Sequence, residues 1–246
     1  MSVCLLIRHG RTAANTAGVL AGWSEGVELD EVGAEQVAQV AQQLSDVPVR
    51  RIVASPLTRC QQTAQALAAR TGVGMETDDR LGECRYGDWT GRSISDLTKE
   101  PLWQVVQQHP SAARFPDGPS YPGESIASMA HRAVAAVREI DAAVAAEHGE
   151  HAVWVAVSHG DVIKAVVAEA AGTHLDLFQR YVVDPASVCV IRYAAGRPFV
   201  VRVNDSATSL ATLLAPPPEH PTDGVAASDA VVGGGAGAPS KVGTWL

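Results

Sequence analysis

Short apolar runs alternate with longer amphipathic patterns along most of this chain, and this alternation constrains the fold more than any other feature. Strands that are buried on both faces of a parallel sheet read as continuous apolar runs, because crossover helices cover both faces. We therefore expect an α/β fold: a three-layer sandwich with a mostly parallel central sheet and helices on both faces. The expected strands are residues 2–7, 51–54 and 152–157, extended by residues 187–193 and 199–203, which a turn at Gly196 would join.

Capping residues indicate where the helices begin and end. Asp30 is a good N-cap for a helix whose apolar stripe ends near Leu44. Ser55 and Pro56 suit the N-cap and the first position of the next helix, which would carry Arg59 on its first turn. The other expected helices are residues 126–147, ended by Gly149, and a segment that follows Asp161 and runs to Gly172.

The composition changes near residue 208, where a predicted α/β domain, residues 1–207, gives way to a tail, residues 208–246. The tail contains Pro216–Pro218 and Gly233–Gly235, and few large apolar residues precede Trp245. Such a composition is typical of a flexible segment. One expectation that it raises is a homodimer in which the tail makes contacts.

Charge and cysteine usage narrow the functional classes. The 246 residues include 19 Lys and Arg and 27 Asp and Glu, a formal net charge of −8, so the overall field repels nucleic acids. The four cysteines form no C-x-x-C pair, which favours reduced thiols. The first residues lack the basic lead-in of a signal peptide, and no apolar run is long enough for a membrane span. We expect a cytoplasmic protein whose partners include neither nucleic acid nor membrane.

Charged and imidazole side chains follow three of the expected strands. Arg8 and His9 follow the first, Arg59 lies just beyond the second, and His159 follows the third. Ligands of open α/β sheets sit outside the carboxyl ends of the strands, so we expect these groups at one edge. Two imidazoles and two guanidiniums would form a cationic cup, which suits a phosphate dianion without a metal ion or a cofactor.

The same residue types suggest a reaction. A neutral histidine is a competent nucleophile towards phosphorus, and His9 would form a covalent phosphohistidine. Arg8, Arg59 and His159 would hold the equatorial oxygens, where negative charge is spread in the transition state. Glu83 lies in a Gly-rich loop that could bring its carboxyl over the cup as a general acid for the leaving oxygen.

The motifs resemble those of the histidine phosphatase superfamily. Residues 8–15 resemble the opening signature R-H-G-x-T-x-x-N, and residues 55–59, 83–91 and 158–160 resemble the later blocks in the same order. The resemblance spans about residues 3–203 and implies a phosphoglycerate mutase-like fold. It also implies roles for individual residues. The catalytic residues would be His9, Glu83, His159, Arg8 and Arg59, and the phosphate-binding residues would be Arg8, Asn15, Arg59 and His159.

The residues after these motifs combine features for and against the mutase branch of this superfamily. Mutases usually carry two adjacent arginines after the glutamate block and Asn after Ser-His-Gly, whereas this chain lacks the pair and has Asp161. Tyr86, by contrast, is the residue that mutases tend to have. The alanine- and valine-rich composition and the long tail resemble those of an actinobacterial subgroup, whose members are named as probable phosphatases or phosphomutases. Gly22, Arg85 and Arg92 are the candidates for contacting the rest of a substrate.

The function expected from these residues is hydrolysis of small phosphomonoesters, with a small phosphorylated metabolite as the substrate. A cofactor-dependent phosphoglycerate-type mutase is the alternative within the same chemistry, and it would need a bisphosphate primer. A regulatory protein that binds a phosphate ligand without turnover is the alternative from another class. The presence of His9, Glu83 and His159 together argues against that last hypothesis.

Overall fold

A six-stranded sheet runs through the residues that the structure, a computed structural model, describes: 2–194, 197–206 and 230–237. Its strands are β1 (Ser2–Arg8), β2 (Val49–Ala54), β3 (Met75–Thr77), β4 (Val153–Ser158), β5 (Val188–Ala194) and β6 (Arg197–Asp205). Their spatial order is β3-β2-β4-β1-β5-β6. The first four strands pair in parallel, and β5 runs antiparallel to both of its neighbours. The predicted mostly parallel sheet is confirmed.

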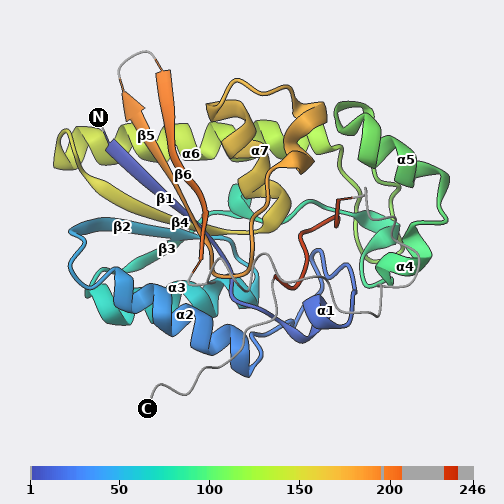
Figure 1. Cartoon of the computed structure of the whole chain (residues 1–246), viewed down its shortest axis with the longest axis horizontal. Coiled ribbons are helices and arrows are strands. Elements are labelled where there is room, and N and C mark those ends of the chain that lie inside the picture. Colours follow the sequence, from blue (N-terminus) through green and yellow to red (C-terminus); the bar gives the residue numbers. More distant parts are fainter. Residues whose placement is uncertain (1, 195–196, 207–229, 238–246) are drawn as a thin grey trace.

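Helices cover both faces of this sheet (Figure 1). On one face lie α2 (Glu31–Gln43) and α3 (Thr58–Thr71), and on the other lie α6 (Ile126–His148) and α7 (Gly160–Ala170). Three shorter helices are α1 (Ala13–Thr16), α4 (Ile94–Leu97) and α5 (Pro101–Gln108). The predicted three-layer α/β sandwich is therefore confirmed.

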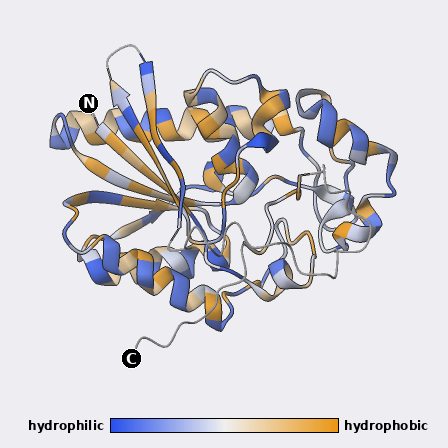
Figure 2. Cartoon of the chain, in the orientation of Figure 1, coloured by the Kyte–Doolittle hydropathy of each residue, from blue (hydrophilic) through white to orange (hydrophobic). Residues whose placement is uncertain are grey.

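Alternation along β1 divides the core into two halves. Cys4 and Leu6 pack with α6 and α7, whereas Leu5 and Ile7 pack with α2 and α3. All four side chains are buried. Figure 2 shows the apolar strands enclosed between helices that carry hydrophilic residues on their outer sides. Burial on both faces is the reason that this strand reads as a continuous apolar run.

Most predicted helix boundaries agree with the structure. The Asp30 side chain accepts a hydrogen bond from Gly33 N, as expected of an N-cap, and Gly149 ends α6. Arg59 lies on the first turn of α3, as predicted. The sequence analysis did not anticipate β3 or the short helices α1, α4 and α5, because these elements are too short to show a clear period.

The predicted cap of α3 was wrong. The helix begins at Thr58, with Leu57 as its N-cap, so Ser55 and Pro56 precede it. The Ser55 hydroxyl lies 2.7 Å from His159 Nε2 instead. A tertiary contact therefore uses the side chain that local preference alone would assign to a cap.

Part of the predicted tail packs against the α/β domain. Ala230 exchanges two hydrogen bonds with the Gln107 side chain of α5, both of 2.9 Å. Figure 1 shows residues 230–237, in red, running past α1 and α7. The predicted turn at Gly196 and the remainder of the tail lie outside the described residues. The division at residue 207 and the homodimer stay predictions.

Two further features bear on the predicted environment of the chain. None of the helices within the described ranges is both long and apolar enough to cross a membrane. The four cysteines are buried and their thiols are free. The cytoplasmic location itself stays a prediction.

A buried carboxylate joins α6 to the sheet. Asp141 accepts hydrogen bonds from Ser2 Oγ at 2.6 Å and from Trp154 Nε1 at 2.9 Å. Asp141→Ala would leave both buried donors without an acceptor, so we expect the free energy of unfolding to fall by about 2–4 kcal/mol in urea denaturation. Glu139→Ala, at an exposed position of the same helix, is the control. Equal losses in the two variants would contradict this role of Asp141.

Candidate active site

The strand register brings polar strand ends together at one edge of the sheet. Arg8, the last residue of β1, pairs in register with Ser158, the last residue of β4. β2 ends beside β4 and leads into α3, which carries Arg59. The rings of His9 and His159 lie edge to face, with their centroids 5.2 Å apart. Arg8, His9, Arg59 and His159 thus gather at the carboxyl edge, where α/β sheets bind ligands.

The hydrogen bonds of His9 define its tautomer. Its Nε2 accepts from Arg59 Nε at 3.2 Å, and because a guanidinium only donates, Nε2 carries no proton. The proton is then on Nδ1, which donates to Gly10 O at 2.7 Å. Burial and the positive charges of Arg59 and Arg8 lower the pKa of His9 well below its usual value. An unprotonated Nε2 at neutral pH is chemically able to act as a nucleophile.

Arg8 and Arg59 are both buried, and each keeps one donor without a partner. Arg59 Nη2 donates to Gly22 O and Arg8 Nη1 donates to Val183 O, each at 2.8 Å. Among the described residues, the buried atoms Arg8 Nε and Arg59 Nη1 have no hydrogen-bond partner. Buried polar atoms without partners are uncommon in folded proteins. Two such guanidinium N–H groups near a histidine suit an anion with several oxygens.

His159 is completely buried beside this pair. Its Nε2 lies 2.7 Å from Ser55 Oγ, which also accepts from Leu57 N at 3.3 Å, so the serine fixes the orientation of the ring. Burial and the positive charge of Arg59 lower the pKa of His159 well below its usual value. The ring is therefore neutral near pH 7.

Glu83 provides a carboxyl group at the same site. The side chain is only 3% exposed, and its Oε1 accepts from Cys84 N at 2.9 Å. Burial, together with the negative charge of Asp161, raises the pKa of Glu83 to about 8. At pH 7 the carboxyl is therefore mostly protonated and able to donate a proton.

Asp161, on the first turn of α7, is a second buried carboxylate near Glu83. Its Oδ2 accepts from Tyr86 Oη at 2.8 Å, and its Oδ1 lies 3.5 Å from Lys164 Nζ. The Gln179 amide completes this cluster, since it accepts from Lys164 and donates to Asp161. Asp161 is thus surrounded by hydrogen-bond donors within the same buried region as Glu83.

A cavity of about 40 Å³ lies at this edge of the sheet. His9, Arg59 and Glu83 line it, and so do residues 231–235 from the C-terminal part of the chain. Arg8 and His159 do not line it, but Arg8 bonds to Gly234 and the His159 ring lies against His9, both of which do. The other lining residues are Thr12, Asn15, residues 18–22, Tyr86 and Ile94.

Besides Arg59, two of the predicted binding residues, Asn15 and Gly22, line this cavity. The Asn15 Oδ1 accepts from Thr12 N at 3.0 Å and from Thr12 Oγ1 at 2.9 Å, so its amide nitrogen is the end left for a ligand. Gly22 contributes its carbonyl to Arg59. A Cβ at Gly22 would lie 3.0 Å from both Thr90 Oγ1 and Tyr86 Cδ2, and its φ is +48°, so a larger residue would be strained there.

The other two predicted substrate residues lie away from the cavity lining. The Arg85 guanidinium stacks on the Trp23 ring, 3.9 Å from the ring centroid. Arg92 forms ion pairs with Glu100 at 2.5 Å and with Asp88 at 3.4 Å. Contact of Arg85 or Arg92 with a substrate stays a prediction.

The comparison with protein families agrees with this geometry. The model of the histidine phosphatase superfamily (branch 1) matches residues 4–206. This chain belongs to the histidine phosphatase superfamily. The superfamily contains both phosphatases and mutases, so membership supports an enzyme that acts on phosphoric monoesters.

Several relatives of this superfamily member are similar over part or most of its length. The probable phosphoglycerate mutase GpmB of Yersinia pestis (strain Pestoides F) is 38% identical over 117 residues, which are 47% of this chain and 54% of the relative. The chain thus spans about half the length of the curated relatives that it matches. The mycobacterial glucosyl-3-phosphoglycerate phosphatase in complex with VO3 is 26% identical, with a TM-score of 0.71 over 83% of this chain and 99% of that chain.

A more distant structure shares the fold. A phosphoserine phosphatase from Entamoeba histolytica, solved with 3-phosphoglyceric acid, is 23% identical and has a TM-score of 0.72. The match covers 84% of this chain and 98% of that chain. The predicted phosphoglycerate mutase-like fold and the predicted superfamily are therefore both confirmed.

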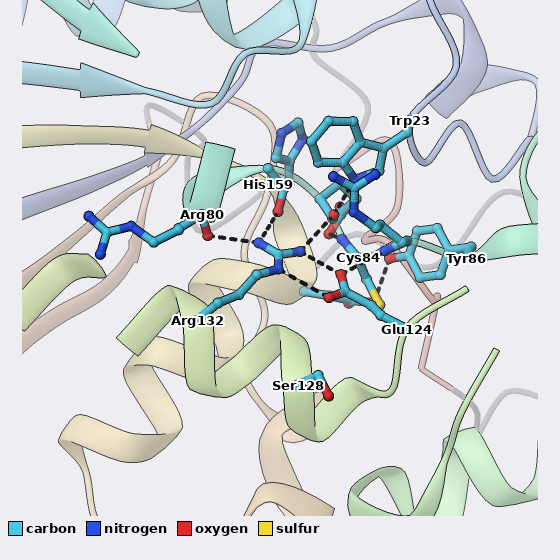
Figure 3. Close-up of polar contacts among 12 residues, drawn as sticks. Trp23, Arg80, Cys84, Tyr86, Glu124, Ser128, Arg132 and His159 are labelled. Atoms are coloured by element: carbon cyan, nitrogen blue, oxygen red, sulfur yellow. Dashed lines mark hydrogen bonds and ion pairs between the residues drawn. The ribbon is translucent and has the colours of Figure 1, made fainter. Parts of the chain in front are cut away.

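An arginine that the sequence analysis missed holds the Glu83 loop of this superfamily member. Arg132 on α6 donates through Nη1 to Arg80 O at 2.7 Å and to Gly82 O at 2.8 Å, and through Nη2 to Glu83 O at 2.9 Å. Glu124 pairs with the same guanidinium at 2.5 Å. Figure 3 shows Arg132 at the centre of these contacts, with Arg80 and Glu124 on opposite sides. One side chain thus fixes three successive parts of the loop backbone.

A faint signal for Arg132 exists in the sequence. The residue lies three positions after Met129 and four before Ala136, both of which are completely buried. A charged residue on the apolar stripe of a helix therefore marks a partner inside the fold. Residues 231–235 offered no comparable signal, because their composition is typical of a linker.

The sequence analysis predicts that the reaction at this site needs no metal ion. Across the ranges that the structure describes, no group of three or more His, Cys, Asp or Glu side chains is placed to hold a metal ion. Activity assays without added metal test this prediction.

Arg132→Met would keep much of the volume of the side chain and remove its donors. Three backbone carbonyls and the Glu124 carboxylate would lose a buried partner, so we expect the free energy of unfolding to fall by about 3 kcal/mol. Hydrogen exchange at residues 80–84 should also accelerate. Arg138→Met, on the same helix, is the matched control, because it removes an arginine from a half-exposed ion pair with Glu169 of α7. Unchanged exchange in the loop of the Arg132 variant would contradict the role assigned to it.

Proposed function

We propose that this protein is a metal-independent phosphatase that hydrolyses small phosphomonoesters through a phosphohistidine at His9. The observation that carries the proposal is the unprotonated His9 Nε2 in a buried site where Arg8 Nε and Arg59 Nη1 have no partner. A phosphoryl group supplies the acceptor oxygens that these donors lack. The acidic net charge of −8 favours a small phosphorylated metabolite over a nucleic acid as the substrate.

The first half-reaction transfers the phosphoryl group to the enzyme. His9 Nε2 forms a bond to phosphorus while the bond between phosphorus and the ester oxygen breaks. The Glu83 carboxyl gives its proton to that oxygen, and the product leaves as an alcohol. Arg8, Arg59, His159 and the Asn15 amide hold the other phosphoryl oxygens during the transfer.

The second half-reaction returns the enzyme to its starting state. A water oxygen bonds to phosphorus, the bond from phosphorus to Nε2 breaks, and the electron pair returns to the imidazole. The Glu83 carboxylate takes the proton from that water and is again a carboxylic acid. Inorganic phosphate is the second product.

A phosphoglycerate-type mutase is the second candidate, favoured by the 38% identity to a probable phosphoglycerate mutase. Such an enzyme would return the phosphoryl group to a reoriented substrate rather than to water, and a bisphosphate primer would keep His9 phosphorylated. The phosphatase names of the similar structures favour hydrolysis. Both reactions use the same first half-reaction, so the fate of the phosphoenzyme separates them.

The deciding experiment incubates the protein, without added metal, with 3-phosphoglycerate and a panel of phosphomonoesters. We expect phosphate release without isomerisation, and we expect His9→Ala to lose both turnover and the phosphoenzyme. Phosphate release and phosphoglycerate isomerisation are followed in parallel, with and without 2,3-bisphosphoglycerate.

Each other result rejects a part of the proposal. Isomerisation that depends on the bisphosphate, with little free phosphate, would identify a mutase. Normal turnover by the His9 variant would exclude His9 as the nucleophile. Phosphate binding without turnover of any ester would favour a regulatory protein.

The pKa values predict the pH dependence of hydrolysis. Glu83, with a pKa of about 8, keeps its proton below that pH and loses it above, whereas His9 is already neutral at pH 6.5 because its pKa is lowered. We expect kcat/KM for alkyl phosphates to be level from pH 6.5 to about 7.5 and to fall about tenfold per pH unit above 8.

Glu83→Gln is the control for this assignment. The variant should hydrolyse alkyl phosphates slowly at every pH and lose the decline above pH 8, and p-nitrophenyl phosphate should be affected least, since its leaving group needs little protonation. A decline of the same size in wild type and variant would assign the titration to another group.

A further inference from the structure

Residues 230–237, which we call the strap, are anchored at both sides of the active site. The Gln107 side chain on α5 holds Ala230 through two hydrogen bonds, and Val232 is 1% exposed. Gly233 N donates to Asp161 Oδ2 at 3.0 Å, the same oxygen that accepts from Tyr86. The strap is therefore a built part of the site rather than a segment that merely passes over it.

The strap accepts hydrogen bonds from Arg8, the first residue of the R-H-G-x-T-x-x-N signature. Arg8 Nη2 donates to Gly234 O at 2.9 Å and lies 3.4 Å from Gly233 O. Arg8 does not line the cavity, although its neighbour His9 does, and residues 231–235 form part of the wall. Backbone carbonyls thus occupy the Nη2 donor of Arg8, which a phosphoryl group could otherwise use together with the open Nε.

Glycine is required for this close approach. A Cβ at Gly234 would lie 2.8 Å from Arg8 Nη1, and the φ of Gly234, +77°, is one that other residues rarely adopt. On the opposite side, a Cβ at Gly160 would lie 2.7 Å from Gly233 O. The strap therefore fits against Arg8 because Gly234 has no side chain, and against the first turn of α7 because Gly160 has none.

We propose that the strap competes with the phosphoryl group for Arg8 and must withdraw from it before a phosphate ester can bind fully. The proposal rests on the phosphate site proposed above and adds a determinant of its affinity. In the docked state the cavity has room for little more than a small anion, so the strap also limits which esters enter.

Two kinds of acceptor, the strap carbonyls and the phosphate oxygens, compete for the Arg8 donors, and their strengths set the fraction of molecules with the strap docked. A phosphate dianion forms stronger, charge-assisted hydrogen bonds with a guanidinium than a neutral carbonyl does. The carbonyl, however, belongs to the same chain and is present at a high effective concentration. If the strap is docked in roughly nine tenths of molecules, the apparent affinity for phosphate is reduced about tenfold.

Gly234→Ala in the full-length chain tests the competition directly. The added methyl group meets Arg8 and strains the backbone, so the strap should leave the arginine, and inorganic phosphate should bind about tenfold more tightly by calorimetry. Gly235→Ala is the matched control, because the nearest atom to a Cβ there is 3.9 Å away. The control should bind phosphate as the wild type does.

A second variant releases the strap without touching the phosphate site. Gln107→Ala removes both hydrogen bonds to Ala230, and Gln104→Ala on the same helix, where the side chain is exposed and contacts Gln108, is its control. We expect tighter phosphate binding in the Gln107 variant alone. Hydrogen exchange at residues 230–237 of the wild type should accelerate when phosphate is added.

The outcomes separate this proposal from the proposed function. Equal phosphate affinity in wild type, Gly234→Ala and Gln107→Ala, or weaker binding in the two variants, would overturn the competition, as would protection of the strap by phosphate. Tighter binding in both variants, with no ester hydrolysed by any of them, would support the competition while rejecting the phosphatase. Ester hydrolysis, together with the same phosphate affinity in the wild type and both variants, would support the phosphatase and overturn the competition.

Discussion

Arg8 and Arg59 lie almost completely out of contact with solvent at the carboxyl edge of the sheet, and burying a cation costs several kcal/mol unless other groups replace its water. Carbonyls of Val183, Gly22 and Gly234 replace part of that water. Loops and the strap therefore pass close to the end of β1, where their backbone carbonyls accept hydrogen bonds from these two guanidiniums. The donors that remain open are those that a phosphoryl group can use.

Burial is the main cause of the different protonation states in the site. It lowers the pKa of His9 and of His159, and the positive charges of Arg59 and Arg8 act in the same direction, so both rings are neutral. Glu83 experiences the opposite balance, because burial and the Asp161 carboxylate outweigh the attraction of the arginines and raise its pKa. A neutral imidazole and a protonated carboxylic acid consequently coexist at neutral pH, and this is the combination that the proposed phosphoryl transfer needs.

Arginine binding to backbone carbonyls recurs in three places around the site. Arg8 holds the strap, Arg59 holds the Gly22 turn, and Arg132 holds the Glu83 loop. Each contact uses a backbone carbonyl, and at Gly22 and Gly234 the carbonyl comes close only because the residue has no side chain. The three arginines thereby place segments without regular secondary structure around one cavity.

The sequence by itself indicated most of the sheet, the long helices that cover it, and the polar residues that gather at one edge of the sheet. Apolar period and strand length indicate β1, β2 and β4, and the residues that follow them carry charge or imidazole, so their convergence at one edge follows from parallel pairing. Local preference was misleading at Ser55, where a cap was predicted and the hydroxyl instead holds His159.

Only the tertiary structure decided what holds and covers the site. The Arg132 contacts and the strap both depend on backbone carbonyls, and since every residue has a carbonyl, the sequence does not show which of them an arginine binds. Residues 230–237 are glycine-rich and have no apolar period, so they read as linker, and their place against Arg8 follows from shape and from the need of a buried guanidinium for acceptors. Contacts between side chains of distinctive type could be anticipated from the chain, and contacts to the common backbone could not.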